Sequence, residues 1–255
     1  LNSKKATGNE KLVVGDIIKL FMADDTIAKF RGNTTVKEVK SSPIDTKIVI
    51  DNILYEDEDI LIINKPAGVL SQKATPGDIS INEMIIEYLI QNSKLTMEDL
   101  NTFKPSICNR LDRNTSGLIT FGKTLAGIQD LSYGFKERTF DKYYLAVVWG
   151  EVRESSNISG YLVKDNKTNK VSISTKKIED ASYIETSYEP LEVTNINVNN
   201  TNKKITLLKI KLITGKTHQI RAQLAKNSMV IKGDVKYGAR RSDSIPGIRL
   251  YAKSI

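Results

Sequence analysis

One carboxylate in the sequence lies between two cations, within the stretch NRLDRNTSGLIT. Asp112 follows Arg110 by two residues and directly precedes Arg113. Nearby positive charge favours the ionised form of a carboxylate, which makes it a poor general acid. An ionised Asp112 can instead act as a nucleophile, as a base or as an electrostatic stabiliser of a developing cation. The competing interpretation is a purely structural Arg–Asp ion pair, since such pairs are common and contribute little.

The residues around Asp112 argue against several other kinds of chemistry. Glycoside hydrolysis by two carboxylates needs a second positioned acid, but the polar neighbours are Asn109, Asn114, Thr115 and Ser116. The Thr-Ser-Gly sequence does not match a serine nucleophile elbow. The chain has one cysteine and one histidine, which argues against a disulfide framework and against a zinc site. We therefore expect neither a disulfide framework nor a zinc site.

Charge is distributed unevenly along the 255 residues. The whole chain carries +8, but residues 201–255 hold thirteen Lys and Arg against two Asp, and residues 51–100 hold ten Asp and Glu against three Lys. A segment that is more basic than the chain as a whole indicates a positive face, for which a polyanion such as RNA is the expected partner. Solubility alone is the competing explanation. No apolar run approaches the roughly 20 residues of a membrane span, so we expect no membrane partner and a cytoplasmic location.

The hydrophobic pattern places Asp112 in a domain that mixes helices and strands. Strands are expected around residues 17–22, 60–64, 118–121, 143–149 and 205–215, and helices over 80–89, 125–136 and 217–226. Ser80 and Glu83 resemble a capping box. Strands outnumber helices and follow one another through hairpin-like turns, which favours an α+β fold with a mixed, largely antiparallel sheet. Residues 31–47 are polar and aperiodic, and they predict a linker between residues 1–30 and 48–255.

Four ordered motifs, and a segment that follows the last of them, resemble those of the RluA-type RNA pseudouridine synthases. NRLDRNTSGL is similar to the family's His-Arg-Leu-Asp-x-x-Thr-Ser-Gly-Leu, and INKPAGVL resembles its opening motif. KYYLAVVWG resembles Lys-x-Tyr-x-Ala-x-Val-x-Gly, TGKTHQIR resembles Thr-Gly-Arg-Thr-His-Gln-Ile-Arg, and IKGDVKYG matches the Gly-Asp-x-x-Tyr-Gly segment that follows. The resemblance covers residues 46–255. It implies the pseudouridine synthase fold, an α+β sheet with flanking helices and a central cleft.

The resemblance also implies an activity and a set of site residues. The activity is isomerisation of uridine to pseudouridine within RNA, without a metal or cofactor. Asp112 would be the catalytic carboxylate, Arg221 would pair with it, and Tyr144 would stack on the uracil or exchange a proton. The other motif cations would bind RNA. Arg110 would take the place of the extruded base in its stack. The remaining cations would contact phosphates: Arg113, Lys65 and Lys216. The competing roles are a core aromatic for Tyr144 and a phosphate contact for Arg110.

Three positions depart from the family's usual residues. Asn109 stands where the family usually has His, Lys216 replaces an Arg, and Gln223 replaces a frequent His. Lys216 keeps the positive charge but loses the bidentate geometry of a guanidinium. Residues 1–30 resemble the back half of an αL-type RNA-binding module.

Two other functions stay open at this stage. One is a non-catalytic RNA-binding or ribosome-assembly protein that retains the fold, and the other is a base-excising glycosylase that cleaves the same bond. For the enzyme itself, the resemblance points to large-subunit ribosomal RNA as substrate, with transfer RNA as the other candidate. We expect a monomer, since the sequence contains no coiled-coil pattern.

Overall fold

The computed structural model describes residues 44–165, 170–198, 200–240 and 247–255, together with scattered residues before position 44. The chain divides into two compact units, Leu1–Pro43 and Ile44–Ile255. In the first unit the expected turn forms at Gly15, where the Asp16 N–H donates to the carbonyl of Val13 at 3.1 Å. The strand expected around 17–22 is wrong for residues 17–19, which are irregular. Positions 20 and 22 of that strand and residues 31–43 of the predicted linker lie outside the described residues.

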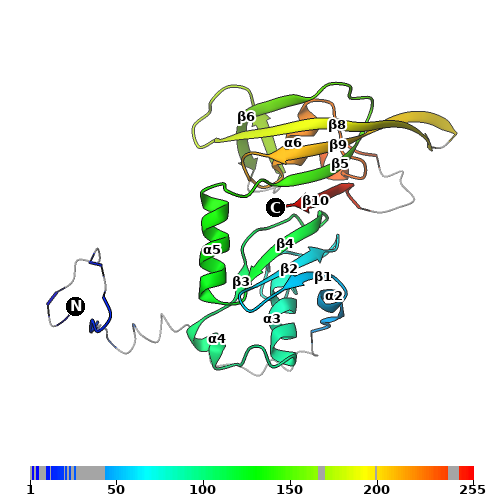
Figure 1. Cartoon of the computed structure of the whole chain (residues 1–255). Coiled ribbons are helices and arrows are strands. Elements are labelled where there is room, and N and C mark those ends of the chain that lie inside the picture. Colours follow the sequence, from blue (N-terminus) through cyan, green and yellow to red (C-terminus); the bar gives the residue numbers. More distant parts are fainter. Residues whose placement is uncertain are drawn as a thin grey trace. The chain divides into compact units, whose positions relative to one another are not determined.

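The second unit is built on one sheet, with ten strands among the described residues (Figure 1). The strands are β1 Ile53–Glu56, β2 Ile60–Lys65, β3 Ser106–Ile107, β4 Ser116–Gly122, β5 Tyr143–Trp149, β6 Ser156–Asp165, β7 Lys170–Ser174, β8 Ser182–Val198, β9 Thr201–Leu212 and β10 Leu250–Ser254. Their order is β1-β2-β4-β10-β5-β9-β8-β6-β7, and β3 pairs with β4 beside this path. Only β4 and β10 run parallel among these pairs. The predicted mixed, largely antiparallel α+β fold is confirmed.

The main core lies between the sheet and the helix α3. The helical elements of this unit are α2 Lys47–Ile50, α3 Ile81–Gln91, α4 Asp99–Thr102, α5 Leu125–Lys136, α6 Gln219–Lys226 and the 3-10 turn η1 Val235–Tyr237. Leu61 and Ile63 occupy alternate positions of β2, and Ile81, Ile85 and Leu89 recur every four residues of α3, so both elements turn an apolar face inward. All five are buried in one cluster.

The start of α3 differs from the predicted capping box. Ser80 donates its hydroxyl to the carboxylate of Glu83 and makes no side-chain bond to the helix backbone. The α5 helix is capped in the usual way, because the Thr124 hydroxyl accepts the N–H of Gly127 at 3.1 Å.

The last strand of the chain, β10, fills the centre of the sheet between β4 and β5. Ala252 lies opposite Gly117 of β4 and opposite Tyr144 of β5. Gly117 has φ +119°, and a Cβ there would collide with the backbone of Ala252, so only glycine permits this approach. The row Gly117, Ala252 and Tyr144 brings the end of the Asp112 loop beside β5. The sequence pattern did not predict this central position of β10.

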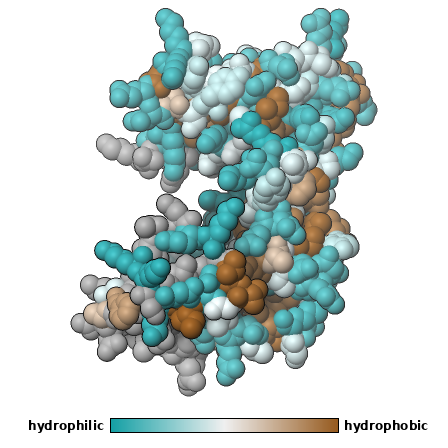
Figure 2. Space-filling view, turned by 60° about the vertical axis from the view of Figure 1, so that its left-hand side comes forward, coloured by the Kyte–Doolittle hydropathy of each residue, from teal (hydrophilic) through white to brown (hydrophobic). Residues whose placement is uncertain are grey.

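A smaller cluster fixes α6 against the other half of the sheet. It contains Leu162, Val171, Ile184, Ala222 and Tyr237. On the face shown in Figure 2, hydrophilic residues cover most of the surface and hydrophobic ones are scattered. Among the described residues, no helix combines the length and apolar character required to span a membrane.

Candidate active site

Asp112 lies in the loop between β3 and β4, and the segment after β2 holds this loop in place. The buried Ser71 hydroxyl donates to the Leu111 carbonyl at 2.7 Å and accepts the Leu111 N–H at 3.0 Å. On the other side of Asp112, the carbonyl of Arg113 accepts the N–H of Gly68 at 2.8 Å. The backbone is therefore fixed immediately before and after the carboxylate.

Asn109 closes the neck of the same loop. Its side-chain nitrogen donates to the Leu118 carbonyl at 3.1 Å, and its oxygen accepts the Thr120 N–H at 2.8 Å. An amide provides this donor and acceptor together, so asparagine serves here as a bridge from the loop to β4. The residue is half-buried and makes no contact with the Asp112 carboxylate among the interactions of the described residues.

Arg221, on the first turn of α6, reaches Asp112 from 109 positions away in the sequence. Its Nη1 donates to Asp112 Oδ2 at 2.7 Å, and its Nε and Nη2 donate to Asp234 at 2.7 and 2.9 Å. Although burial acts in the opposite direction, the hydrogen bonds to Asp234 and Asp112 raise the pKa of Arg221 above its ordinary value. The guanidinium therefore stays charged and lies between two carboxylates.

The two oxygens of Asp112 have different environments. Oδ2 accepts from Arg221 and lies 3.6 Å from His218 Nε2, which is too long for a hydrogen bond. No described residue donates a hydrogen bond to Oδ1. The side chain is 22% exposed, so the carboxylate is held on one side and open to solvent on the other.

His218 and Tyr237 support this arrangement without contacting the open oxygen. His218 stands directly before α6 with φ 55°, and its Nδ1 lies 2.9 Å from the Tyr237 hydroxyl. Burial lowers the pKa of His218, with Asp112 acting in the opposite direction. The Tyr237 ring lies 5.1 Å from the Arg221 guanidinium carbon, within the range of a cation–π contact.

The sequence reasoning assigned no role to Asp234 or Tyr237. Both belong to the IKGDVKYG segment that was matched as a motif. The available signal was the acid itself, since Asp234 is one of two acids among the last 55 residues. It is 1% exposed, and a buried acid in a basic segment indicates a fixed ion pair.

Tyr144 of β5 belongs to the hydrophobic core and is 8% exposed. Burial, and secondly the charge of Asp112, raise the pKa of its hydroxyl to about 12. Its hydroxyl has no hydrogen-bond partner among the described residues. Tyr144 is therefore a neutral phenol whose pKa is affected by the nearby charge of Asp112. It can offer a ring face for stacking or an O–H group as a hydrogen-bond donor.

Lys65 does not lie where an RNA contact needs it. Its side chain is fully buried, and its ammonium donates to the carbonyls of Pro66, Val69 and Arg113 at 2.8, 2.9 and 3.1 Å. The prediction that Lys65 contacts phosphates is therefore wrong, because a group with no exposed surface cannot meet a phosphate. Lys65 instead ties the segment after β2 to the Asp112 loop.

The other predicted RNA-binding cations are exposed. Arg110, Arg113 and Lys216 all have side chains open to solvent. Within the described part of the chain, neither Arg110 nor Arg113 forms an ion pair with Asp112. The cation that pairs with the carboxylate is Arg221, the residue that the family resemblance places beside it, and not a flanking arginine.

Two cavities among the described residues lie away from Asp112. One of about 400 Å³ is lined by Arg138, residues 140–142, one residue each of β6 and β8, and residues 211–213, and one of about 390 Å³ is lined by residues 151–154 and Tyr188. Neither includes Asp112, Tyr144 or Arg221, so the predicted central cleft corresponds to neither. The described residues contain no group of three or more His, Cys, Asp or Glu placed to hold a metal.

Comparison with known proteins gives consistent results. The family model described as RNA pseudouridylate synthase matches residues 59–226. An RNA pseudouridine synthase of Mycoplasma genitalium is 32% identical over 186 residues, which cover 72% of this chain and 55% of that protein. A ribosomal large subunit pseudouridine synthase D of Borreliella burgdorferi is 30% identical over 73% of this chain and 54% of its own length. The chain thus spans about half the length of these two relatives.

Another relative and two solved structures extend the comparison. A ribosomal large subunit pseudouridine synthase C of Buchnera aphidicola is 30% identical over 100% of this chain and 76% of its own length. Human RNA Pseudouridylate Synthase Domain Containing 1 superposes with a TM-score of 0.60 at 23% identity, covering 79% of this chain and 76% of that one. Human RNA Pseudouridylate Synthase Domain Containing 4 gives 0.60 at 20% identity, with 81% and 84% covered. These similarities show the same fold.

Proposed function

Because this chain belongs to the RNA pseudouridylate synthase family, we propose that it isomerises uridine to pseudouridine in RNA with Asp112 as the catalytic carboxylate. The observation that carries this proposal is the asymmetry of Asp112. Arg221 holds one oxygen at 2.7 Å, while the other oxygen accepts no hydrogen bond from a described residue. A carboxylate that is oriented on one side and accessible on the other is suited to react with a substrate.

The charge and burial of each site residue indicate its role in the proposed reaction. The glycosidic C–N bond of the target uridine breaks, the uracil turns, and a C–C bond forms at the same sugar carbon. Asp112 supports this exchange through its open oxygen, as nucleophile, base or stabiliser of positive charge on the sugar. Arg221 orients Asp112, and Tyr144 offers its ring for stacking or its hydroxyl as a donor.

The uridine must leave its stack to reach Asp112, which costs a few kcal/mol. The exposed Arg110 adjoins Asp112 in the same loop, and its guanidinium plane can take the vacated place in the stack. Arg113 and Lys216 are exposed as well and are suited to bind backbone phosphates. All three side chains are therefore already exposed where RNA could contact them.

We propose large-subunit ribosomal RNA as the substrate. Two relatives carry this RNA in their names, and residues 201–255 of this chain are strongly basic. We also propose a cytoplasmic monomer, in keeping with a substrate found in that compartment. Residues 1–30 would add RNA contacts as a partial module.

Tritium release from an unmodified large-subunit ribosomal RNA transcript tests the activity. Uridine labelled at C5 loses its tritium when the new C–C bond forms, so the wild-type chain should release tritium in proportion to pseudouridine. Asp112→Asn should abolish release while keeping RNA affinity within a few-fold. Asp130→Asn is the matched control, because Asp130 is an exposed acid of α5 outside the site and should leave release unchanged.

The same experiment separates the alternatives. RNA binding without tritium release by the wild-type chain would favour a non-catalytic RNA-binding protein. Free uracil among the products would reveal a glycosylase. Full turnover by Asp112→Asn would reject Asp112 as the catalytic group.

A further inference from the structure

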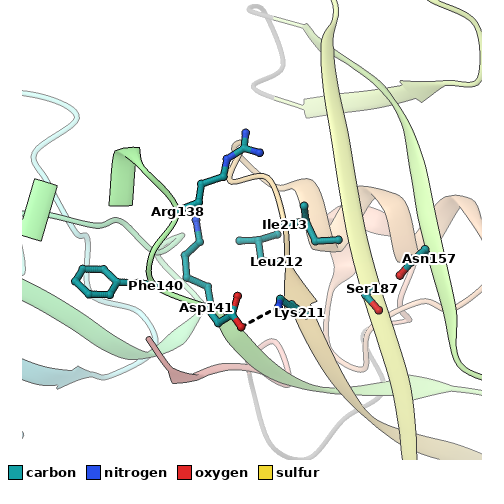
Figure 3. Close-up of a pocket in the computed structure, with 9 residues that line it drawn as sticks. Arg138, Phe140, Asp141, Asn157, Ser187, Lys211, Leu212 and Ile213 are labelled. Carbon is teal, nitrogen blue, oxygen red and sulfur yellow. Dashed lines mark hydrogen bonds and ion pairs between the residues drawn. The ribbon is translucent and has the colours of Figure 1, made fainter. Parts of the chain in front are cut away.

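The cavity of about 400 Å³ lies where the connection from α5 enters β5. Its volume is within the usual range of ligand sites. Its charged lining residues are Arg138, Asp141, Lys142 and Lys211, and Figure 3 shows Arg138 extending from the connection towards the end of β9. The Asp112 site described above includes none of these residues.

The cations of this cavity outnumber its acids. Asp141 forms an ion pair with Lys211 at 2.8 Å, which neutralises both (Figure 3). Arg138 and Lys142 have no hydrogen-bond or ion-pair partner for their side-chain nitrogens within the described part of the chain. Two positive charges in one cavity are therefore left without a counter-charge.

The environment of Lys142 makes this imbalance costly. Its side chain is half-buried, and its Nζ lies close to Gly215, where an added Cβ would meet it at 3.2 Å. Burial lowers the pKa of Lys142, and the charge of Arg138 lowers it further. A partly desolvated ammonium beside another cation is unfavourable, and an anion between the two would offset that cost.

Arg138 occupies a backbone position that favours glycine. It follows the last residues of α5 with φ 57°, and the Thr139 N–H donates to the Gly134 carbonyl at 3.0 Å. This is the bonding of a Schellman motif, whose left-handed residue is usually glycine. An arginine in that position carries a conformational cost, which is consistent with a use for its side chain.

Neutral polar groups complete the lining. Strand pairing aligns Asn157 of β6 with Ser187 of β8, and Ser187 with Lys211 of β9, so the three side chains point to the same side of the sheet. No hydrogen bond uses the side chain of Asn157 or Ser187 within the described residues. The amide and the hydroxyl are therefore available as donors beside the two cations.

We propose that this cavity binds a phosphodiester group of the RNA substrate, with Arg138 and Lys142 as its principal contacts. The identity of the ligand rests on the proposed function. Lys142 precedes Tyr144 by two residues, or about 7 Å along an extended chain, so the phosphate held here belongs to the RNA near the target uridine. RNA is preferred to an acidic protein because the chain belongs to a family that modifies RNA.

Three variants test the cavity in different ways. Arg138→Gly removes a cation where glycine fits the backbone best, so its melting temperature should be unchanged or higher. Lys142→Gln removes the second cation. Asn157→Asp adds a negative charge to the cavity with almost no change of shape. Lys104→Gln is the control, since Lys104 is an exposed cation outside the cavity.

RNA affinity is measured by fluorescence anisotropy on an unmodified large-subunit ribosomal RNA fragment over a series of potassium chloride concentrations. Each of the three variants should weaken binding by about 5- to 20-fold and reduce the salt slope by about 0.7 to 0.9, the effect of one lost phosphate contact. KM in the tritium assay should rise by more than kcat falls. Lys104→Gln should show none of these changes.

The outcomes distinguish the cavity from the catalytic function. If the three variants bind RNA as Lys104→Gln does at every salt concentration, the cavity proposal is overturned, whether or not the chain makes pseudouridine. It is also overturned if calorimetry detects inorganic phosphate in the cavity while RNA affinity is unaffected by the variants. If the variants weaken RNA binding but the wild-type chain makes no pseudouridine, the cavity proposal stands and the enzymatic function fails.

Discussion

Asp234 determines how Arg221 meets Asp112. It accepts two hydrogen bonds from Arg221, at 2.7 Å from Nε and 2.9 Å from Nη2, and this bidentate pairing fixes the plane of the guanidinium. The remaining terminal nitrogen, Nη1, then points to Asp112 at 2.7 Å. The ring of Tyr237 lies beside the same guanidinium. Arg221 therefore orients Asp112, and the buried Asp234 orients Arg221.

This relationship makes Asp234 a positioning residue. Asp234→Asn keeps the shape of the side chain but turns one acceptor into a donor, which faces the donors of Arg221. We expect kcat to fall by about 100-fold, because a displacement of about 1 Å at a catalytic group has that effect, with a smaller change in KM. Removing one partner of this buried pair should also lower the free energy of unfolding by roughly 3 kcal/mol. Steady-state kinetics and urea unfolding measure the two effects.

A purely structural role for Asp234 is tested by rescue. Asp234→Glu retains the charge and should recover part of kcat even if stability stays low. If kcat in both variants follows only the fraction of folded protein, Asp234 stabilises the fold and does not position Arg221.

Lys65 should behave as an internal support for the Asp112 loop and not as an RNA contact. Lys65→Met leaves the carbonyls of Pro66 and Val69 without this donor, while removing a buried charge. Each unsatisfied buried carbonyl costs about 1–3 kcal/mol, so we expect a net loss of about 2–4 kcal/mol in urea unfolding. The salt slope of RNA binding should match that of wild type. A slope reduced by nearly one would restore Lys65 as a phosphate contact.

The buried ammonium of Lys65 also predicts a pH dependence of stability. Burial lowers its pKa from 10.5 to about 8, with the charge of Asp112 acting in the opposite direction. Between these two values the unfolded chain binds more protons at Lys65 than the folded chain does, so stability from this group rises with pH. Relative to Lys65→Met, the free energy of unfolding of wild type should increase by up to about 1.4 kcal/mol per pH unit in that window. A difference that is flat or falling from pH 8 to 10 would contradict the buried, destabilised ammonium.

The family and the class of fold were predictable because local motifs carry them. The alternation of apolar residues at Leu61 and Ile63 and the helical spacing of Ile81 and Ile85 are short-range patterns that survive in the fold. The position of β10 in the centre of the sheet was not predictable, because it depends on the close approach of Ala252 to Gly117. That contact joins segments 135 positions apart, and neither segment alone predicts it.

The partners of each charged residue were less predictable than the motifs. Sequence proximity predicts that Arg110 and Arg113 keep Asp112 ionised, but both side chains are exposed and neither forms an ion pair with it. The sequence places Lys65 with the RNA-binding cations, since lysine is rarely fully buried and nothing in the motif itself shows its partners. Its burial depends on three carbonyls that gather only after the loop folds. The role of Asp234 likewise depends on the packing of α6 and could not be read from spacing.

Tyr144 should remain a neutral phenol between pH 6 and 9. Burial, and then the charge of Asp112, raise its pKa from 10.0 to about 12. A raised pKa means that the folded chain holds the proton more tightly, so stability from this group is complete below pH 10 and is lost as pH rises towards 12. Tyr144→Phe should therefore change the height of the kcat profile between pH 6 and 9 but not its shape. The wild-type minus Tyr144→Phe difference in absorbance near 295 nm should show no tyrosinate below about pH 11. If the kcat–pH profile of wild type changes slope near pH 8–9 and the profile of Tyr144→Phe does not, Tyr144 is instead a titrating base.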